Sequence, residues 1–175
     1  MSRVISIDLE TNGLWGDSFA FGAVSRSKDG SINRVSFRCP IDGEVNPWVA
    51  ENVLPEMEAI EVTHSDREGF LKAIAEWYMI EKEDAQILWH MGHVIETNLF
   101  RELVDRGLIG EWDAPYVPLE LSMILQMNGF APDSVDGYLK NNGLGVPAMD
   151  GGTHNPLYDS YAALLAYESL VAEKL

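Results

Sequence analysis

The sequence predicts a single α/β domain in which an antiparallel meander of three strands forms part of a mixed sheet, with helices packed against that sheet. Three observations lead to this fold class. Three short segments rich in apolar residues come first, a segment with helical periodicity follows, and a further apolar strand then leads into a series of helices. This order is typical of α/β layer architectures. The length of 175 residues suits one domain with a substantial core, so we expect residues 1–175 to form one domain.

The three strands of the meander are predicted at residues 3–8, 19–24 and 32–37. The first is a short run rich in β-branched residues, and the turn signal at residues 11–13 (Thr-Asn-Gly) stops it. Asp29-Gly30 separates the second strand from the third, which indicates a hairpin.

The middle of the chain predicts helices around a central strand. Residues 39–58 contain three prolines, and we expect short helical pieces there. Residues 68–82 carry apolar side chains at helical spacing, which predicts an amphipathic helix. The remaining elements, in chain order, are a buried strand at 87–91, a helix at 96–106, an extended segment at 115–118, helices at 119–127 and 134–142, a glycine-rich loop at 143–152, and a helix from about 156 to the C-terminus.

The charge of the chain restricts the possible partners. Twelve Lys and Arg face 28 Asp and Glu, which gives a formal net charge of −16. Proteins that bind nucleic acid through phosphate contacts are usually basic. The negative electrostatic field of this chain therefore excludes tight binding of a long duplex through phosphate contacts alone. It leaves a protein that binds no nucleic acid, one that binds only a short end, or one whose metal ions supply the positive charge.

Compartment signals are few. Cys39 is the only cysteine, so no disulfide can form within the chain, and this suits a reducing compartment. The N-terminal residues lack the basic start and apolar run of a signal peptide, and no segment reaches the ~18 apolar residues of a membrane span. We expect a soluble, cytoplasmic protein with no membrane partner.

Two carboxylates end the first predicted strand. Asp8 and Glu10 flank Leu9, and alternate side chains share one face of a strand. Carboxylates held this close repel and raise each other's pKa, and a divalent cation between them removes that cost. Oxygen ligands suit Mg²⁺ or Mn²⁺. Taken alone, the pair could equally be a solvated strand end.

A second group of polar residues precedes and opens the last predicted helix. The glycine-rich loop leads to His154, and Asp159 lies more than one turn into the helix beside small residues at 162, 163 and 166 that favour close packing. A neutral histidine in such a place can accept a proton from water near pH 7. The alternative for this segment alone is a surface histidine near a first-turn carboxylate.

Together these segments resemble the DEDDh branch of the 3′→5′ exonuclease superfamily, which has a ribonuclease H-like fold and includes proofreading subunits, ribonuclease T and oligoribonuclease. Residues 5–14 resemble its first motif, a strand that carries Asp-x-Glu-Thr followed by a glycine turn. His154 and Asp159, before an alanine-rich helix, resemble its third motif. The resemblance spans nearly the whole chain. Trp89, seven residues before Glu96, resembles the central strand of the small bacterial and phage exoribonuclease-like branch.

The second motif of the superfamily departs from its pattern here. An Asp is expected where a helix opens after the central strand, and this sequence has Glu96 at that position. The additional methylene moves the carboxylate by about one bond length, and Mg²⁺ is strict about geometry. The site is therefore open to remodelling, to weak binding of one metal ion, or to loss of activity. His93 and Asn98 are the rival ligands.

The resemblance implies hydrolysis of phosphodiester bonds with two divalent ions, Mg²⁺ or Mn²⁺, and release of nucleoside 5′-monophosphates. Asp8, Glu10 and Asp159 would share one ion, and Asp8 would hold the other with help from Glu96. His154 would take the proton from the attacking water.

The turn after the first strand is the expected substrate contact. Backbone amides of Thr11, Asn12 and Gly13 would meet the terminal nucleotide, and Leu14 and Trp15 would stack on the last base or wedge against it. The expected partner is the 3′ end of single-stranded RNA or DNA. Because members of the superfamily are often dimers, a homodimer is possible.

Three other functions remain open on the sequence. Glu96 favours a catalytically inactive domain of the same fold that binds nucleic acid or protein. An unrelated metal-dependent enzyme, such as a phosphatase, could use the same acids. An acidic interaction protein would show no dependence of its stability on metal ions.

Overall fold

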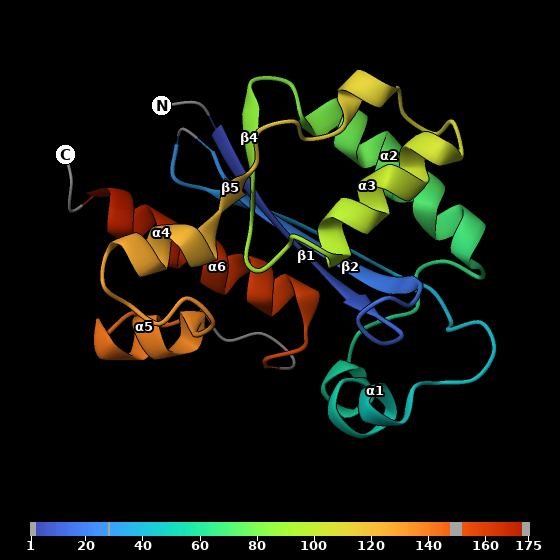
Figure 1. The fold of residues 1–175 in the computed structure, drawn as a ribbon, viewed down its shortest axis with the longest axis horizontal. Coiled ribbons are helices and arrows are strands. Elements are labelled where there is room, and N and C mark those ends of the chain that lie inside the picture. The colour runs from blue at the N-terminus through green and yellow to red at the C-terminus, as the bar shows by residue number, and fades with distance from the viewer. Residues whose placement is uncertain (1–2, 28, 148–151, 173–175) are drawn as a thin grey trace.

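The computed structural model describes residues 3–27, 29–147 and 152–172. A five-stranded sheet with the strand order β3-β2-β1-β4-β5 forms its centre (Figure 1). The meander pairs are antiparallel, whereas β1 with β4 and β4 with β5 run parallel, so the sheet is mixed as the sequence predicted. The strands are β1 (Arg3–Thr11), β2 (Ser18–Arg26), β3 (Ile32–Arg38), β4 (Ala85–Trp89) and β5 (Leu119–Glu120).

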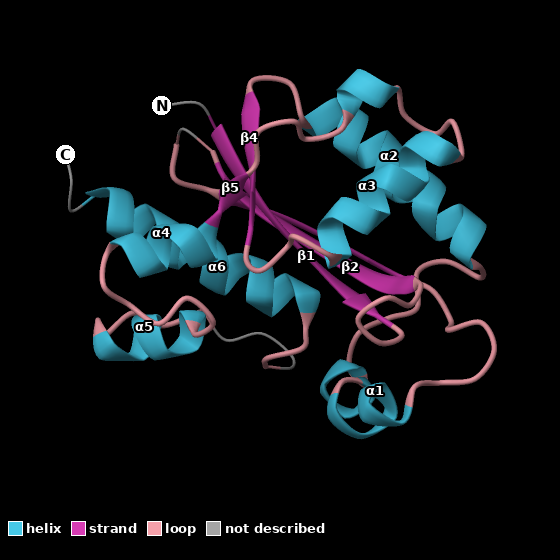
Figure 2. Ribbon diagram, in the orientation of Figure 1, coloured by secondary structure: helices cyan, strands magenta, loops and turns pink. Residues whose placement is uncertain are grey.

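Helices cover both faces of the sheet (Figure 2). Side-chain caps fix several helix starts: Asp66 accepts a hydrogen bond from the Gly69 amide at the start of α2, and Ser134 accepts one from the Gly137 amide at the start of α5. The helices are α1 (Pro47–Asn52), α2 (Arg67–Glu81), α3 (Ile95–Asp105), α4 (Leu121–Met127), α5 (Val135–Asn141) and α6 (Pro156–Ala172), with 3₁₀ turns at Leu54–Met57 and Glu111–Asp113.

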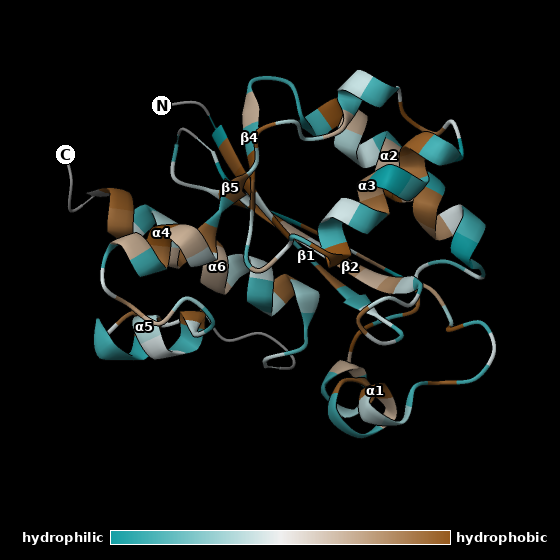
Figure 3. Ribbon diagram, in the orientation of Figure 1, coloured by the Kyte–Doolittle hydropathy of each residue, from teal (hydrophilic) through white to brown (hydrophobic). Residues whose placement is uncertain are grey.

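Successive side chains of β1 point to opposite faces of the sheet, and each face has its own buried cluster. Ile5, Ile7 and Leu9 point toward α2 and α3 and join one buried cluster, and the intervening residues face α6. Hydrophobic residues accordingly concentrate on the central strands and the helices against them (Figure 3). On the second face the buried residues include Leu88, Leu121, Leu125, Val135, Tyr138, Leu139, Ala162, Ala163, Ala166 and Leu170. Asp8 and Glu10 therefore lie on the α6 side of the sheet.

Close contact between α6 and β2 is possible because residue 22 is glycine. A Cβ atom at Gly22 would lie 2.3 Å from the carbonyl carbon of Pro156. The hydroxyl of Ser160 donates a hydrogen bond of 2.9 Å to the carbonyl oxygen of Gly22. Asp8 pairs with Gly22 in the sheet register, so this contact brings the first turns of α6 over the acidic end of β1.

Several predicted boundaries shift in the structure. The central strand β4 ends at Trp89, because the chain turns at Met91, whose φ is 59°. Residues 115–118 form no strand, and the parallel strand β5 instead takes the first two residues of the predicted helix at 119–127. Of the predicted loop at 143–152, residues 148–151 lie outside the described part of the chain, as do the last three residues of the predicted C-terminal helix.

Within the described ranges, no helix has both the length and the apolar composition needed to cross a membrane.

Candidate active site

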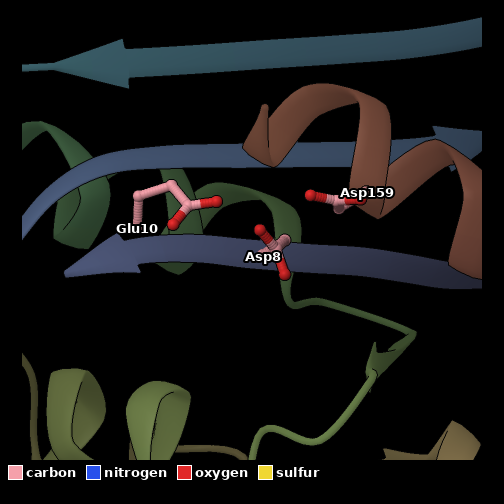
Figure 4. A group of neighbouring side chains, drawn as sticks. All are labelled: Asp8, Glu10 and Asp159. Atoms are coloured by element: carbon pink, nitrogen blue, oxygen red, sulfur yellow. The ribbon is translucent and has the colours of Figure 1, made fainter. Parts of the chain in front are cut away.

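Three of the predicted metal ligands meet at one point of the structure. Asp8 and Glu10 project from β1, and Asp159 projects toward them from the first turns of α6 (Figure 4). One carboxylate oxygen of each lies within 4.8 Å of the others. The strand alternation explains the first two positions, and the close crossing of α6 over Gly22 explains the third.

The electrostatics of this acidic triad (Asp8, Glu10 and Asp159) favour a bound cation. Burial raises the pKa of Asp8 well above its ordinary value, and Asp159, Glu96 and Glu10 raise it further. Burial and then the charge of Glu10 raise the pKa of Asp159 to about 7. Negative charge is therefore disfavoured in the triad without a counter-ion. Three converging carboxylates are a donor set that fits a hard divalent ion.

His154 lies at the edge of the triad. Its Nδ1 atom is 3.7 Å from Oε1 of Glu10, and its backbone N–H donates a hydrogen bond of 2.9 Å to Oδ2 of Asp159. Contact with the Glu10 carboxylate raises the pKa of His154 above its ordinary value, and partial burial opposes that shift. Its ring packs edge-on against the ring of Trp48, with centroids 5.4 Å apart. The imidazole is thus held beside the acids while its side chain stays 41% exposed.

Glu96 occupies a different environment from the triad. It lies in the first turn of α3, is only 3% exposed, and does not line the cleft above the triad. Burial raises its pKa to about 8, with further contributions from Glu120 and Glu10. It is near enough to Asp8 to raise the pKa of that residue. The structure therefore places the fourth predicted acid near Asp8 but beneath the surface, where burial disfavours its charged form.

A cleft of about 630 Å³ opens above the triad. Of the five predicted substrate-binding residues, Thr11, Gly13 and Leu14 line it. Asn12 does not: its amide donates to the carbonyl of Glu44 and accepts from the amide of Asn46, so it ties the turn to the segment before α1.

Trp15 and the rival ligand Asn98 lie in a neighbouring pocket of about 260 Å³, with Leu14 on the boundary between the two. The other rival ligand, His93, is exposed and lines neither the cleft nor this pocket.

The cleft also contains residues that the sequence did not single out. Trp48, on α1, is 56% exposed, and Met91, in the β4–α3 loop, is equally exposed. Asp133 and Asp136 line the cleft beside the start of α5. A tryptophan directly after an Asn-Pro helix start was the available signal for Trp48, since a helix of six residues has little room to bury it. No local pattern pointed to Met91.

Comparison with solved structures identifies related folds, although no protein-family model and no curated protein matches the sequence. Exonuclease I of E. coli in complex with a dA16 oligonucleotide superposes with a TM-score of 0.68 at 15% sequence identity, covering 99% of this chain and 41% of that chain. The zinc-bound form of the E. coli exonuclease I complex with single-stranded DNA gives 0.68 at 14% identity, with the same coverage. Exonuclease X in complex with 5′-overhanging duplex DNA superposes with a TM-score of 0.61 at 21% identity, and the match covers 97% of this chain and 92% of that chain.

The present chain thus spans about two fifths of exonuclease I and nearly all of exonuclease X. Both are exonucleases, and in both cases nearly every residue of this chain is covered. The chain therefore shares the ribonuclease H-like fold of these two exonucleases, and an acidic cluster lies on β1 and α6 of that fold.

Proposed function

We propose that this chain is a metal-dependent 3′→5′ exonuclease that releases nucleoside 5′-monophosphates from single-stranded RNA or DNA ends. The observation that carries the proposal is the convergence of Asp8, Glu10 and Asp159 in a cleft, with His154 beside them, on an exonuclease fold. A scaffold alone would not imply the activity, because one fold hosts many functions. The site on the scaffold is what supports it.

The acidic residues would hold two divalent ions, Mg²⁺ or Mn²⁺. Asp8, Glu10 and Asp159 offer oxygen atoms close enough together for a shared ion, and Glu96 would support the second ion from its buried position beside Asp8. When bound, such ions stabilise the charge on the attacking and leaving oxygens of a displacement at phosphorus.

His154 is proposed as the general base. The attacking water gives a proton to the imidazole as its oxygen bonds to phosphorus, the bond from phosphorus to the 3′ oxygen of the preceding nucleotide breaks, and that oxygen takes up a proton from solvent. Glu10 and the Asp159 carboxylate, which accepts a hydrogen bond from the His154 backbone, keep the ring at the edge of the triad. The proton returns to solvent through the exposed side of the imidazole.

The cleft suits a short, unpaired end. Leu14 and Trp48 present apolar surface to it, and nucleobases stack on such side chains without regard to sequence. The formal charge of −16 opposes a long polyanion, whereas up to four positive charges from two divalent ions would act locally at the triad. The terminal nucleotides are therefore the part of the strand that the protein would bind.

A second function is favoured by Glu96. If its burial prevents support of a second ion, the domain would bind nucleic-acid ends without cutting them. In that case a Glu96→Asp variant, which has the carboxylate of the superfamily motif, would gain a cleavage activity that the wild type lacks.

The deciding experiment uses 5′-labelled single-stranded RNA and DNA of one sequence, with Mg²⁺, Mn²⁺ or EDTA. A ladder that shortens from the 3′ end one nucleotide at a time, and that EDTA abolishes, is the expected result. The faster substrate identifies the preferred nucleic acid. Metal binding without cleavage would favour the binding module, and the absence of both would refute the assignment.

The proposed setting is the cytoplasm, with residues 1–175 acting as one exonuclease domain. The single cysteine, Cys39, is buried, and burial raises the pKa of its thiol to about 11, so it is an unreactive group suited to a reducing compartment. Light scattering would test whether the chain also forms the homodimer that the resemblance allows.

A further inference from the structure

Three non-glycine residues in the described part of the chain have a left-handed backbone: Asp84 (φ 58°), Met91 (φ 59°) and His154 (φ 71°). Asp and His are among the residue types that tolerate this conformation best, whereas methionine has no such tendency. Two of the three, Met91 and His154, line the same cleft. Non-glycine residues in strained conformations often mark functional sites, which makes Met91 the one that needs an explanation.

Neighbouring groups hold Met91 in this conformation. Its backbone N–H donates a hydrogen bond of 2.9 Å to Oε1 of Glu120. The same oxygen accepts hydrogen bonds from the amide and hydroxyl of Ser122 at the start of α4. His154 is held in the same manner, since its own N–H donates to the carboxylate of Asp159. In both cases a carboxylate bound to the amide offsets the cost of a left-handed residue.

The residue after Met91 fixes the path of the loop. A Cβ atom at Gly92 would lie 2.4 Å from the indole of Trp89, so the chain passes directly over that ring. The carbonyl oxygen of Gly92 accepts hydrogen bonds from the amide and hydroxyl of Thr97 in α3. The loop is thus anchored to β4 on one side and to α3 on the other, and the Met91 backbone has little freedom to relax.

Core packing does not explain the strain, because the Met91 residue is 56% exposed. Its side chain lines the cleft together with the apolar residues Leu14, Trp48 and Ile95. The hydrogen bond to Glu120 holds the backbone, but the exposed side chain is not placed by burial in the core. A contact that forms only when the cleft is filled would explain why the conformation is kept.

We propose that the left-handed conformation of Met91 presents its thioether to the face of a nucleobase near the 3′ end of the bound strand. This inference rests on the proposed exonuclease function and deepens it by naming a substrate contact. The methionine side chain is flexible and polarisable, and its sulfur makes favourable contacts with aromatic rings. A contact with the base face would form with any base, so Met91 would add affinity without selecting a sequence.

The test compares Met91→Gly with Asp84→Gly. Glycine removes the left-handed strain in both variants, and Asp84 has nearly the same φ but is exposed outside the cleft. We expect neither variant to lower the Tm measured in EDTA, and Met91→Gly to raise it by about 2 °C. Met91→Gly should raise the KM for a single-stranded oligonucleotide about fivefold with kcat within about twofold, whereas Asp84→Gly should leave both unchanged.

Oligonucleotides that lack one base localise the contact. With an abasic sugar at the last or the second-last position, the KM difference between wild type and Met91→Gly should disappear for one of the two substrates. A Met91→Gly variant with the wild-type KM, or a KM difference that persists on both abasic substrates, would overturn the inference while leaving the exonuclease function intact. A wild-type protein that cleaves no oligonucleotide would instead refute the proposed function, and this inference with it.

Discussion

The acidic triad and Glu96 show how differently one fold can treat carboxylates that lie close together. Asp8, Glu10 and Asp159 line an open cleft, whereas Glu96 is 3% exposed beneath it. Burial is the main cause of the raised pKa in both regions, with values of about 7 for Asp159 and about 8 for Glu96. The cleft opens the triad to ions from solvent, whereas burial shields Glu96 from them.

This difference shows that charge and position in the sequence do not establish a ligand. The sequence offered four acids as ligands, with Glu96 in place of an expected Asp, and the structure brings three of them into a group that could share an ion. Glu120, which adds to the raised pKa of Glu96, makes full ionisation of that side chain still more costly. We infer that the triad supplies most of the metal affinity and that Glu96 adjusts it.

Removal of one triad carboxylate should have the largest effect. Asp8→Asn keeps the size of the side chain but removes the charge that two ions would share, so we expect kcat to fall about 10⁴-fold. The labelled-oligonucleotide assay with Mn²⁺ measures this loss, and Glu61→Gln, an exposed carboxylate remote from the cleft, is the matched control. An Asp8→Asn enzyme with more than a tenth of wild-type kcat would contradict this prediction, because the triad would then not be the metal site.

Loss of the proposed base should rank second. His154→Ala is expected to lower kcat about 10³-fold with little change in KM. In the wild type, contact with Glu10 raises the pKa of His154, and only the neutral ring accepts a proton. The kcat should therefore increase with pH through a value above 6.5 and then level off. His93→Ala, at an exposed position outside the cleft, should keep wild-type kcat. Equal losses in the two variants would argue against a specific role for His154.

Substitutions of Glu96 should have a smaller effect, and they sharpen the comparison most directly. Glu96→Gln preserves size but not charge, and we expect kcat to fall about tenfold because the residue only supports the second ion. Glu96→Asp should stay within about tenfold of wild type in either direction. A loss in Glu96→Gln as large as that in Asp8→Asn would make Glu96 an equal ligand. Activation by Glu96→Asp from an inactive wild type would identify the binding module.

The dependence of stability on pH should show the smallest effect. A carboxyl group whose pKa is raised in the folded state binds its proton more tightly there than in the unfolded chain. The free energy of unfolding without metal should therefore begin to fall at about pH 4, where the unfolded groups ionise, and continue to fall until the pH exceeds the folded pKa of about 7 for Asp159 and about 8 for Glu96. We expect a loss on the order of 2 kcal/mol, which saturating Mn²⁺ reverses.

Thermal unfolding between pH 5 and pH 8.5, in EDTA and in Mn²⁺, measures this change. Glu96→Gln should reduce the loss in EDTA, because the amide has no proton to release. A Tm that does not respond to pH in EDTA would mean that folding does not raise the pKa values of these carboxyl groups when no metal is bound. A Tm that also does not change with Mn²⁺ would support the alternative in which the chain is an acidic interaction protein that binds no metal.

Much of the fold and part of the site follow from local patterns. Period-two alternation places Asp8 and Glu10 on one face of β1 whatever that strand packs against. The helices predicted at 68–82, 96–106 and 134–142 likewise agree with the bounds of α2, α3 and α5 to within one residue. The helix predicted at 119–127 was wrong for its first two residues, because the two-residue strand β5 exists only through its pairing with β4.

The sequence by itself determined the types of side chain available for chemistry, their order along the chain, and the strand that aligns two of them. Tertiary structure alone decided which of them meet. The contact of α6 with Gly22 brings Asp159 to Asp8, the packing of α3 buries Glu96, and the loop held by Glu120 places Met91 in the cleft. These outcomes depend on contacts between segments far apart in the chain, whose packing and desolvation no local pattern specifies.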